Sequence, residues 1–402
     1  MSVQKLQNML TELMGMFISR DDEIKYLAIA MICRENLIFH GPPGCAKSDL
    51  AKELAARITG SNYFYKQMSA DMSRSDLVGP VDPSLILKGQ YRYLTNHYLP
   101  TAHIAVIDEL PRASGVLLDD MLSILNHEGF MNGDVLEPDM LQMAMGTANT
   151  KLTGQHAANA DRWLFRFFVE YLKTDQELEA LDALDLYETR AVKNTLTLQE
   201  LFDIQAMLSD VKQKTSPEVW EAKRELCKSL KANGLVISDR RFKKMNKAIA
   251  AHAIVDGRQE ALLKDLEVLT HIIPDSAEQQ KEIMHEIGKL ANPVKTRVLE
   301  IFDEVSSQYE KVASLFGRKE TELVEKRTRL SQEVYAKVTE GLDEIEKLAK
   351  QDPSEQKIKS IIKTMNNWQQ DLMLKGMKFR MGIKAINSMS TNHPDDVLNA
   401  SK

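Results

Sequence analysis

A glycine-rich loop with the sequence GPPGCAKS spans residues 41–48 and directly follows a short apolar run. Gly41 and Gly44 would allow backbone N–H groups to turn inward around phosphate oxygens, at the start of a helix whose dipole favours an anion. Lys47 would reach the β- and γ-phosphates of a nucleoside triphosphate, and the Ser48 hydroxyl would ligate Mg²⁺. The loop therefore predicts a site for a nucleotide and its metal ion.

The whole loop and the residue after it are expected to surround the nucleotide. Ala46 stands where the general G-x-x-x-x-G-K-[ST] pattern has its second glycine, and Cys45 is expected to contribute only its backbone amide. A Gly/Pro turn that happens to precede Lys-Ser is the alternative, which motifs farther along the chain oppose. The predicted nucleotide-contacting residues here are Gly41, Pro42, Pro43, Gly44, Cys45, Ala46, Lys47, Ser48 and Asp49.

Two adjacent carboxylates, Asp108 and Glu109, end an apolar run in the segment HIAVIDEL. Ligands of open parallel sheets gather at the carboxyl ends of the strands, so this pair is suited to a metal and a phosphate. Asp108 would hold the Mg²⁺ shell, and Glu109 would orient and polarise the attacking water. An acidic residue that only caps the following turn is the alternative interpretation. The arrangement is typical of a Walker B motif.

Polar and cationic side chains in two later segments could complete such a site. Asn149 ends the run MAMGTANT, where it could touch the γ-phosphate or the water as a sensor 1 residue does, or only cap a strand. Arg162 and Arg166 lie in ADRWLFRF, just before an expected fifth strand. Either could be an arginine finger that offsets charge on a neighbouring subunit's nucleotide. An ordinary salt bridge between Asp161 and Arg162 is the competing interpretation.

A basic helix start in the second half of the chain, ISDRRFKK, adds a further candidate. Ser238 or Asp239 is suited to cap the helix, which would turn Arg240 or Arg241 toward a ligand. We select Arg240 as the nucleotide-contacting residue, with a solvated basic helix start as the alternative. The expected place of this helix in a lid beside the nucleotide favours the functional interpretation.

These residues require an α/β scaffold that brings strand ends together. Apolar runs rich in β-branched or aromatic residues predict buried strands near 37–39, 63–65, 104–107, 143–145 and 167–171, with helical periodicity between them. This alternation predicts a parallel sheet between helices over residues 1–172. Strand signals stop near residue 174, which predicts a helical lid over 173–269 and a helical extension over 270–402.

The extension shows a heptad rhythm followed by two further apolar stripes. An antiparallel helical hairpin, bundle or coiled coil is predicted, and both an intramolecular bundle and a partner-binding arm fit the pattern. The first stripe consists of Val298, Phe302, Val305, Tyr309, Val312 and Phe316.

Composition limits the classes of function. The chain has 52 Lys and Arg against 58 Asp and Glu, so it has no overall field for a polyanion, although a local basic groove could exist. Nucleic acid is therefore not the expected partner. Three widely spaced cysteines fit a reducing compartment, and no apolar run reaches the roughly 18 residues that suggest a membrane span. We expect a cytoplasmic protein without a membrane segment.

Taken together, the motifs resemble an AAA+ P-loop module over about residues 15–270 and, within that class, the MoxR family, closest to its RavA subgroup. The resemblance rests first on the order and spacing of the phosphate loop, the acidic pair, Asn149, Asp161-Arg162 and Ser238-Asp239-Arg240. It rests also on the segments SRSDLVGPVDPS, GQYRYLTNHYLPTA, DELPRA, FMNGD, VISDRRFKK and HAIVDGR.

The resemblance implies further features of the fold and the site. It implies an AAA+ core with a helical lid, a hairpin-bearing insertion inside helix 2 at about residues 78–98, and a second hairpin around Asn132 and Gly133. By position, Ile18 and Arg20 match the segment that flanks the adenine of ATP. The chain departs from RavA after residue 270, where we find helices and no β-rich insertion.

The expected function is Mg²⁺-dependent ATP hydrolysis in a homo-oligomeric, hexameric ring that remodels or assembles protein complexes. Members resembling MoxR commonly act with a von Willebrand factor A-type partner, which implies a partner class for this chain. A nucleic-acid-stimulated motor is the first alternative, opposed by the few basic residues in the insertion and hairpin. An ATP-switched assembly scaffold with low turnover is the second, opposed by the intact Asp108-Glu109 pair.

Overall fold

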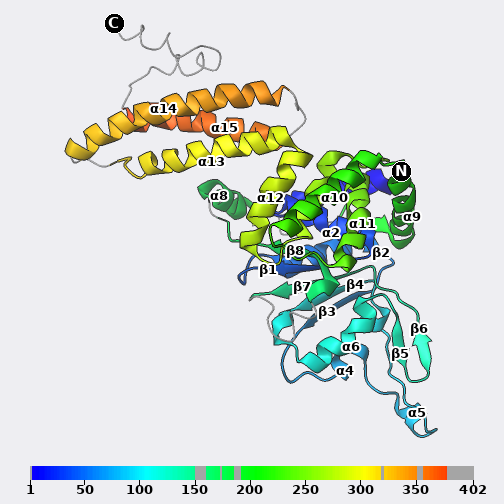
Figure 1. Ribbon diagram of the computed structural model, residues 1–402. Helices are drawn as coiled ribbons and strands as arrows, with labels where there is room; N and C mark the ends of the chain where they lie inside the picture. The colour runs from blue at the N-terminus through cyan, green and yellow to red at the C-terminus, as the bar shows by residue number, and fades with distance from the viewer. Residues whose placement is uncertain are drawn as a thin grey trace. The chain divides into compact units, whose positions relative to one another are not determined.

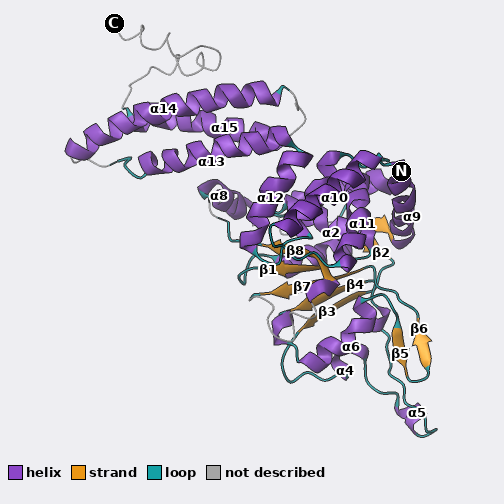
Figure 2. Ribbon diagram, in the orientation of Figure 1, coloured by secondary structure: helices purple, strands orange, loops and turns teal. Residues whose placement is uncertain are grey.

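The computed structural model describes residues 2–149, 160–172, 174–184, 192–317, 321–350 and 356–377. The chain divides into two compact units, Met1–Ala291 and Asn292–Lys402. The first unit contains an α/β core and a group of helices, and the second is helical in its described parts (Figures 1 and 2). Every predicted site residue lies in the first unit.

A five-stranded parallel sheet forms the centre of the first unit, with the strand order β3-β4-β7-β1-β8. Apolar side chains are buried on both of its faces, since Leu37 and Phe39 belong to one core cluster and Ile38 to another. Burial on both faces explains why these strands read as continuous apolar runs. The strands are β1 (Asn36–His40), β3 (Tyr63–Gln67), β4 (Ile104–Asp108), β7 (Met143–Ala148) and β8 (Trp163–Phe168).

The fifth strand begins earlier than predicted. We expected it near 167–171, whereas β8 runs from Trp163 to Phe168 and pairs its last residue with His40 of β1. The charge of Arg166 interrupted the apolar run in the sequence, yet this side chain lies inside the strand and is only 2% exposed. Arg166 is therefore a residue of the fifth strand, and the expectation that it precedes the strand was wrong.

Helices cover both faces of the sheet (Figure 2). α2 (Asp21–Cys33) and α3 (Lys47–Ala56) pack in the core of one face, and α6 (Gly115–Leu125) packs in the core of the other. α6 begins after a serine cap, since the Ser114 hydroxyl accepts the N–H of Leu117 at 3.3 Å. The predicted parallel sheet between helices is confirmed.

The insertion between β3 and β4 contains two short helices, α4 (Ser75–Val78) and α5 (Pro83–Ile86). The family resemblance implied a hairpin-bearing insertion here, and a single antiparallel bridge between Val81 and Tyr93 closes it. Asn132 ties this insertion to the neighbouring hairpin, because its side chain accepts the N–H of Tyr93 at 2.7 Å and donates to the Tyr93 carbonyl at 2.9 Å. The insertion and the hairpin are therefore held together by the Asn132 side chain.

The second hairpin pairs β5 (Phe130–Asn132) with β6 (Val135–Glu137). Gly133 and Asp134 form its two-residue turn, so the turn lies one residue later than the Asn132-Gly133 pair that we expected. The φ of Gly133 is 65°, a left-handed value that glycine adopts without the strain of a side chain.

Helices of the first unit also precede and follow the core. The amino-terminal α1 (Ser2–Met14) packs against α2 and α9, and a two-stranded pair links β2 (Ile58–Thr59) to β9 (Leu196–Thr197). Thr197 forms a capping box with Glu200, which explains the start of α9. The following elements are α8 (Asp175–Leu184), α9 (Leu198–Lys214), α10 (Pro217–Ala232), α11 (Asp239–Val255), η5 (Leu263–His271) and α12 (Ala277–Ala291).

α12 packs against η5 and α10 within the first unit, although the sequence placed its residues in the C-terminal extension. The domain boundaries that we expected near residues 172 and 270 stay predictions.

Three helices form the described part of the second unit: α13 (Pro293–Ala313), α14 (Thr321–Ala349) and α15 (Gln356–Asp371), which continues into the π-helical η6 (Leu372–Gly376). The predicted helical extension is confirmed, and its apolar stripes share one core. Trp368 stacks on Phe302 and Tyr309, with ring centroids 5.0 and 4.7 Å apart. Across the described segments of the chain, no helix has the length and apolarity needed to cross a membrane.

Candidate nucleotide-binding site

The phosphate loop joins the carboxyl end of β1 to the start of α3. Its backbone is attached to the neighbouring strand, since the N–H of Gly41 donates to the Ala148 carbonyl at 3.0 Å. A Cβ at Gly41 would lie 2.3 Å from the Val169 carbonyl oxygen. This close approach requires glycine at position 41, and it places the loop directly against the segment that follows β8.

Gly44 and Ala46 turn the loop into the helix. Their φ values are 82° and 55°, both left-handed. Ala46 thus adopts the conformation that the missing second glycine of the motif would adopt freely, at a cost of roughly 1–2 kcal/mol. The side chain of Cys45 is buried in the core, so only its backbone is available to contact a phosphate. The loop still leads into the amino end of α3, where anions bind.

Lys47 is buried in the loop, with 7% of its surface exposed. Its ammonium donates to the carbonyls of Gly41 at 2.8 Å and Pro42 at 2.5 Å, and lies 3.5 Å from Oδ1 of Asn149. Burial lowers the pKa of Lys47, and the positive charge of Arg20 acts in the same direction. Lys47 of the loop and Asn149, the expected sensor 1 residue, are therefore neighbours.

Ser48 and Asp108 connect the loop to the acidic strand end. The Ser48 hydroxyl donates to Oδ2 of Asp108 at 3.1 Å, and the Tyr65 hydroxyl donates to the same oxygen at 3.0 Å. Burial and the hydrogen bond to Asp108 raise the pKa of Tyr65 to about 12, so this phenol remains a donor at neutral pH. A hydroxyl and a carboxylate are the oxygen ligands that Mg²⁺ prefers, so the residues fit the metal of a nucleotide complex.

Glu109 follows β4 in a left-handed backbone conformation, with a φ of 54°. Its N–H donates to the Thr147 hydroxyl at 3.0 Å, and that hydroxyl in turn donates to Asp108. One buried threonine thus positions both members of the acidic pair. The Glu109 carboxylate forms a 2.6 Å ion pair with Arg112, at the end of the 3-10 helix η2 (Leu110–Arg112).

Contacts from two other segments brace the loop. Arg20 donates to the Glu170 carbonyl at 2.8 Å, and the Tyr171 hydroxyl donates to the Pro43 carbonyl at 3.0 Å. Ile18 is partly buried two residues before Arg20. These contacts connect the chain before α2 to the chain after β8, and the chain after β8 to the phosphate loop.

Arg162 lies at the opposite end of the sheet. It ends η3 (Ala160–Arg162), at the amino end of β8, and its carbonyl accepts the side-chain N–H of Asn36 at 3.3 Å. All five strands are parallel, so the phosphate loop at their carboxyl ends is a strand length away, about 17 Å. The structure therefore brings Lys47, Ser48, Asp108 and Asn149 together and leaves Arg162 apart from them within one chain.

An ionic network with two buried arginines connects this end of the sheet to the helices that follow. Arg241 lies 2.6 Å from Asp161 and 2.8 Å from Asp275, and Arg166 lies 3.1 Å from Asp275. Burial, with the charge of Arg241, lowers the pKa of Arg166 to about 10. Arg166 is thus held inside its own chain by Asp275.

The start of α11 belongs to the same network. Ser238 is the cap, since its hydroxyl accepts the N–H of Arg241 at 3.2 Å, and it donates to Asp161 at 2.8 Å. Arg241 turns inward and is 6% exposed, whereas Arg240 is exposed. The bond to Asp161 places Arg240 near the amino ends of the strands. The expected contact between Arg240 and the nucleotide stays a prediction.

Sequence reasoning missed three residues around the acidic pair: Thr147, Tyr65 and Arg112. Gly146 of β7 pairs with Ile107 of β4. The next residues, Thr147 and Asp108, therefore lie side by side, and alignment of the two strand ends would have shown this. Tyr65 and Arg112 carry no spacing signal. Their contacts depend on strand order and on the turn after β4, which only the structure shows.

A parallel sheet of this order, with a phosphate loop after β1 and an acidic pair after β4, defines a P-loop protein of the AAA+ class. A family described as the MoxR domain in the MoxR-vWA-beta-propeller ternary systems matches residues 4–209, and an AAA lid domain family matches residues 203–287. The chain belongs to the MoxR family of AAA+ ATPases.

Individual relatives agree with this assignment. Two uncharacterized proteins of Methanocaldococcus jannaschii are similar to the chain: one is 33% identical over 302 residues, 74% of this chain and 77% of that protein. The other is 32% identical over 317 residues, 76% and 82% of the two chains. The crystal structure of a proposed ATPase from Cytophaga hutchinsonii superposes with a TM-score of 0.59, covering 72% of this chain and 95% of that one, at 18% identity. That likeness shows the fold.

Proposed function

We propose that the chain hydrolyses ATP with Mg²⁺ at the phosphate loop. The observation that carries this proposal is the 3.1 Å bond between Ser48 and Asp108, because it joins the two motifs that hold the metal of a nucleoside triphosphate. Lys47, which lies in the same loop, would bind the β- and γ-phosphates. When bound, Mg²⁺ would be held by Ser48 and Asp108 and would neutralise charge that develops on the phosphates.

The remaining residues divide the chemical step. A water attacks the γ-phosphorus while the bond to the bridging oxygen of ADP breaks, and Glu109 accepts the proton that the water loses. Asn149, which lies 3.5 Å from the Lys47 ammonium, would contact the γ-phosphate or the water. Ile18 and Arg20 would flank the adenine, because the Arg20 segment is bonded to the chain beside the loop.

We assign Arg162 and Arg240 to the nucleotide of a neighbouring chain. Arg162 lies at the amino end of β8, about 17 Å from its own phosphate loop, so it would not complete its own site. Arg240 lies two residues after Ser238, which binds Asp161 beside Arg162. Head-to-tail contacts would instead bring this end of one chain to the loop of the next, and such contacts close into a ring. A hexamer is the ring size that the family resemblance implies.

The proposed task of the ring is to remodel or assemble protein complexes in the cytoplasm, as members that resemble MoxR commonly do. The joined insertion and hairpin support a protein substrate, since apolar side chains there are exposed, among them Leu87, Tyr91, Met131 and Leu136. The matching family is described from systems that contain a vWA protein, which supports a partner of that type. A partner of this class would direct the ring to its target.

The test separates nucleotide binding from hydrolysis. Lys47→Ala should abolish tight ATP binding, whereas Glu109→Gln should retain ATP and stall its hydrolysis, because phosphate binding and water activation reside on different side chains. Lys52→Ala is the matched control, since Lys52 is an exposed lysine on the same helix. ATP binding by equilibrium dialysis and release of phosphate would be measured for each variant. Hydrolysis at the wild-type rate by Glu109→Gln would contradict the assignment.

A further inference from the structure

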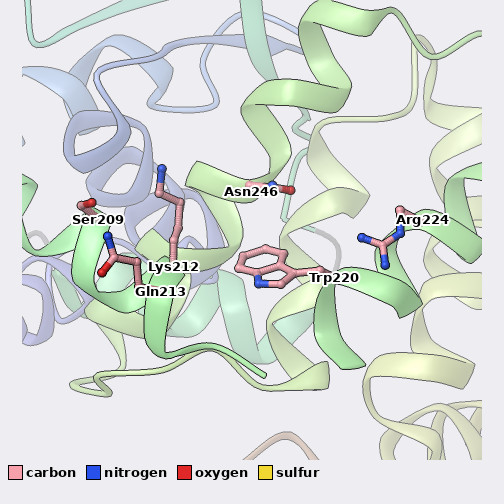
Figure 3. Close-up of a pocket in the computed structure, with 6 residues that line it drawn as sticks. All are labelled: Ser209, Lys212, Gln213, Trp220, Arg224 and Asn246. Carbon is pink, nitrogen blue, oxygen red and sulfur yellow. The ribbon is translucent and has the colours of Figure 1, made fainter. Parts of the chain in front are cut away.

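Two adjoining pockets on the helices after the core form a surface that we call the lid groove. They have volumes of about 440 and 590 Å³ and share Lys212 of α9 and Asn246 of α11 in their walls (Figure 3). The groove is lined by six cationic side chains: Lys212, Arg224, Arg240, Lys243, Lys244 and Lys247.

The charge of the lid groove is largely uncompensated. Glu35, only 3% exposed, is the carboxylate in its wall, and it binds Lys244 and Lys247. Among the described residues, no ion pair holds the other four cations. The excess of positive charge is local to the groove, because the whole chain carries a net charge of -6. Like charges gathered in one concavity repel one another and raise the local concentration of anions.

The groove also offers an aromatic surface and a hydrogen-bond donor. Trp220 packs against the core and is partly buried, and its ring lies between the side chains of Lys212 and Arg224 in Figure 3. Asn246 Oδ1 accepts a hydrogen bond from Lys223 at 2.8 Å, so its NH₂ group is the part that faces a ligand as a donor. Cations on both sides of an indole suit an anion that also has a planar group.

We propose that the lid groove binds a ligand whose phosphates lie beside a planar base. Lys243, Lys244 and Lys247 of α11 bind the phosphates, and Trp220 stacks on the base. A free nucleotide and a single strand of nucleic acid share this chemistry. An acidic peptide would match the charge but leaves Trp220 without a planar partner. Apart from Arg240, which is proposed above to reach a neighbour's nucleotide, the residues of the lid groove take no part in the proposed hydrolysis.

Tryptophan fluorescence can test the proposal at the groove itself. The chain has three tryptophans, and the other two are Trp163, buried in β8, and Trp368, in the second unit. The full chain with Lys47→Ala, which weakens the phosphate loop, would be titrated with UTP and with a short oligouridylate at low ionic strength. A stacked uracil should quench the indole, and Trp220→Phe should remove the quenching.

Charge variants test the phosphate side. Lys212→Ala/Lys243→Ala should weaken binding of the active probe about tenfold, since two exposed charge contacts are lost. The matched control, Lys264→Ala/Lys281→Ala, removes two exposed lysines elsewhere and should bind as before. Quenching by UTP alone identifies a free nucleotide, and quenching by the oligouridylate identifies a nucleic acid strand. Three results would overturn the proposal: no quenching by either probe, equal binding by the two double variants, or tighter binding of polyglutamate.

Discussion

Glu109 and Arg112 form a 2.6 Å ion pair within the turn that follows β4. The N–H of Arg112 also donates to the Glu109 carbonyl at 2.9 Å, so backbone and side chain hold the two residues in one turn. In this geometry the carboxylate proposed to activate water is bound to a guanidinium of its own chain. The pair therefore competes with the proposed role of Glu109.

Replacing Arg112 should increase hydrolysis. Arg112 is 65% exposed, and exposed ion pairs are worth up to about 1 kcal/mol, so Arg112→Ala should raise kcat by about threefold and leave KM for ATP unchanged. Arg112→Lys retains the charge and should stay near the wild-type rate. Steady-state phosphate release would decide between the outcomes. A lower kcat in Arg112→Ala would show that the guanidinium assists the reaction.

Arg241 and Arg240 should give opposite phenotypes. Arg241→Ala removes the partner of Asp161 and Asp275, so the free energy of unfolding should fall by about 2–3 kcal/mol. Arg240 is exposed, so Arg240→Ala should change stability by no more than about 0.5 kcal/mol while lowering turnover of the assembled protein. Denaturant unfolding and ATPase rates would be compared. Normal stability in Arg241→Ala would contradict the structural role of this network.

Stability should depend on pH through His271. The His271 ring stacks on the Phe167 ring, with centroids 4.0 Å apart, and lies edge-on to the Tyr26 ring, with centroids 4.4 Å apart. Burial lowers the pKa of His271 from 6.5 to about 4. Between these values the unfolded chain binds more protons than the folded chain, so stability falls as the pH falls from about 6.5 toward 4. From pH 7 to pH 5 the loss through His271 should be about 2 kcal/mol.

The variant His271→Phe isolates this effect. It retains an aromatic ring between Phe167 and Tyr26 and removes the titrating group. Urea unfolding of wild type and variant at both pH values would show whether the difference in pH dependence has the expected size. Equal pH dependence in the two proteins would mean that His271 is not the responsible group.

The sequence could predict the sheet because its strands are buried on both faces. Such strands are continuous apolar runs, and those of β1, β4 and β7 were recognisable in position and order along the chain. β3 at the edge exposes Tyr63 and Tyr65 and was recognisable by its aromatic residues. The β8 run contains Arg166, whose charge is balanced by Asp275 more than 100 residues later, and no local pattern reveals that partner. A buried charge with a distant partner therefore shifted the predicted strand.

The site could be predicted in part, for a related physical reason. Lys47 and Ser48 lie in one loop, and parallel strand ends bring Asp108 and Asn149 to it, so the motifs alone imply their proximity. The position of Arg240 could not be derived from the sequence, because it depends on how α11 packs, through Ser238 and Asp161, against the other end of the sheet. Sequence spacing carries no information on that packing.

The central claim is that Lys47 of one chain and Arg162 of a neighbour form one ATPase site. Arg162→Ala and Lys47→Ala should each be nearly inactive, because an arginine finger is worth on the order of 10³ or more in rate. In a mixture of the two variants, some contacts pair an intact Lys47 with an intact Arg162. The account predicts that mixing restores part of the activity, and that wild-type specific activity rises with protein concentration. Wild-type activity from a dilute, verified monomer, or no recovery on mixing variants that still assemble, would contradict it.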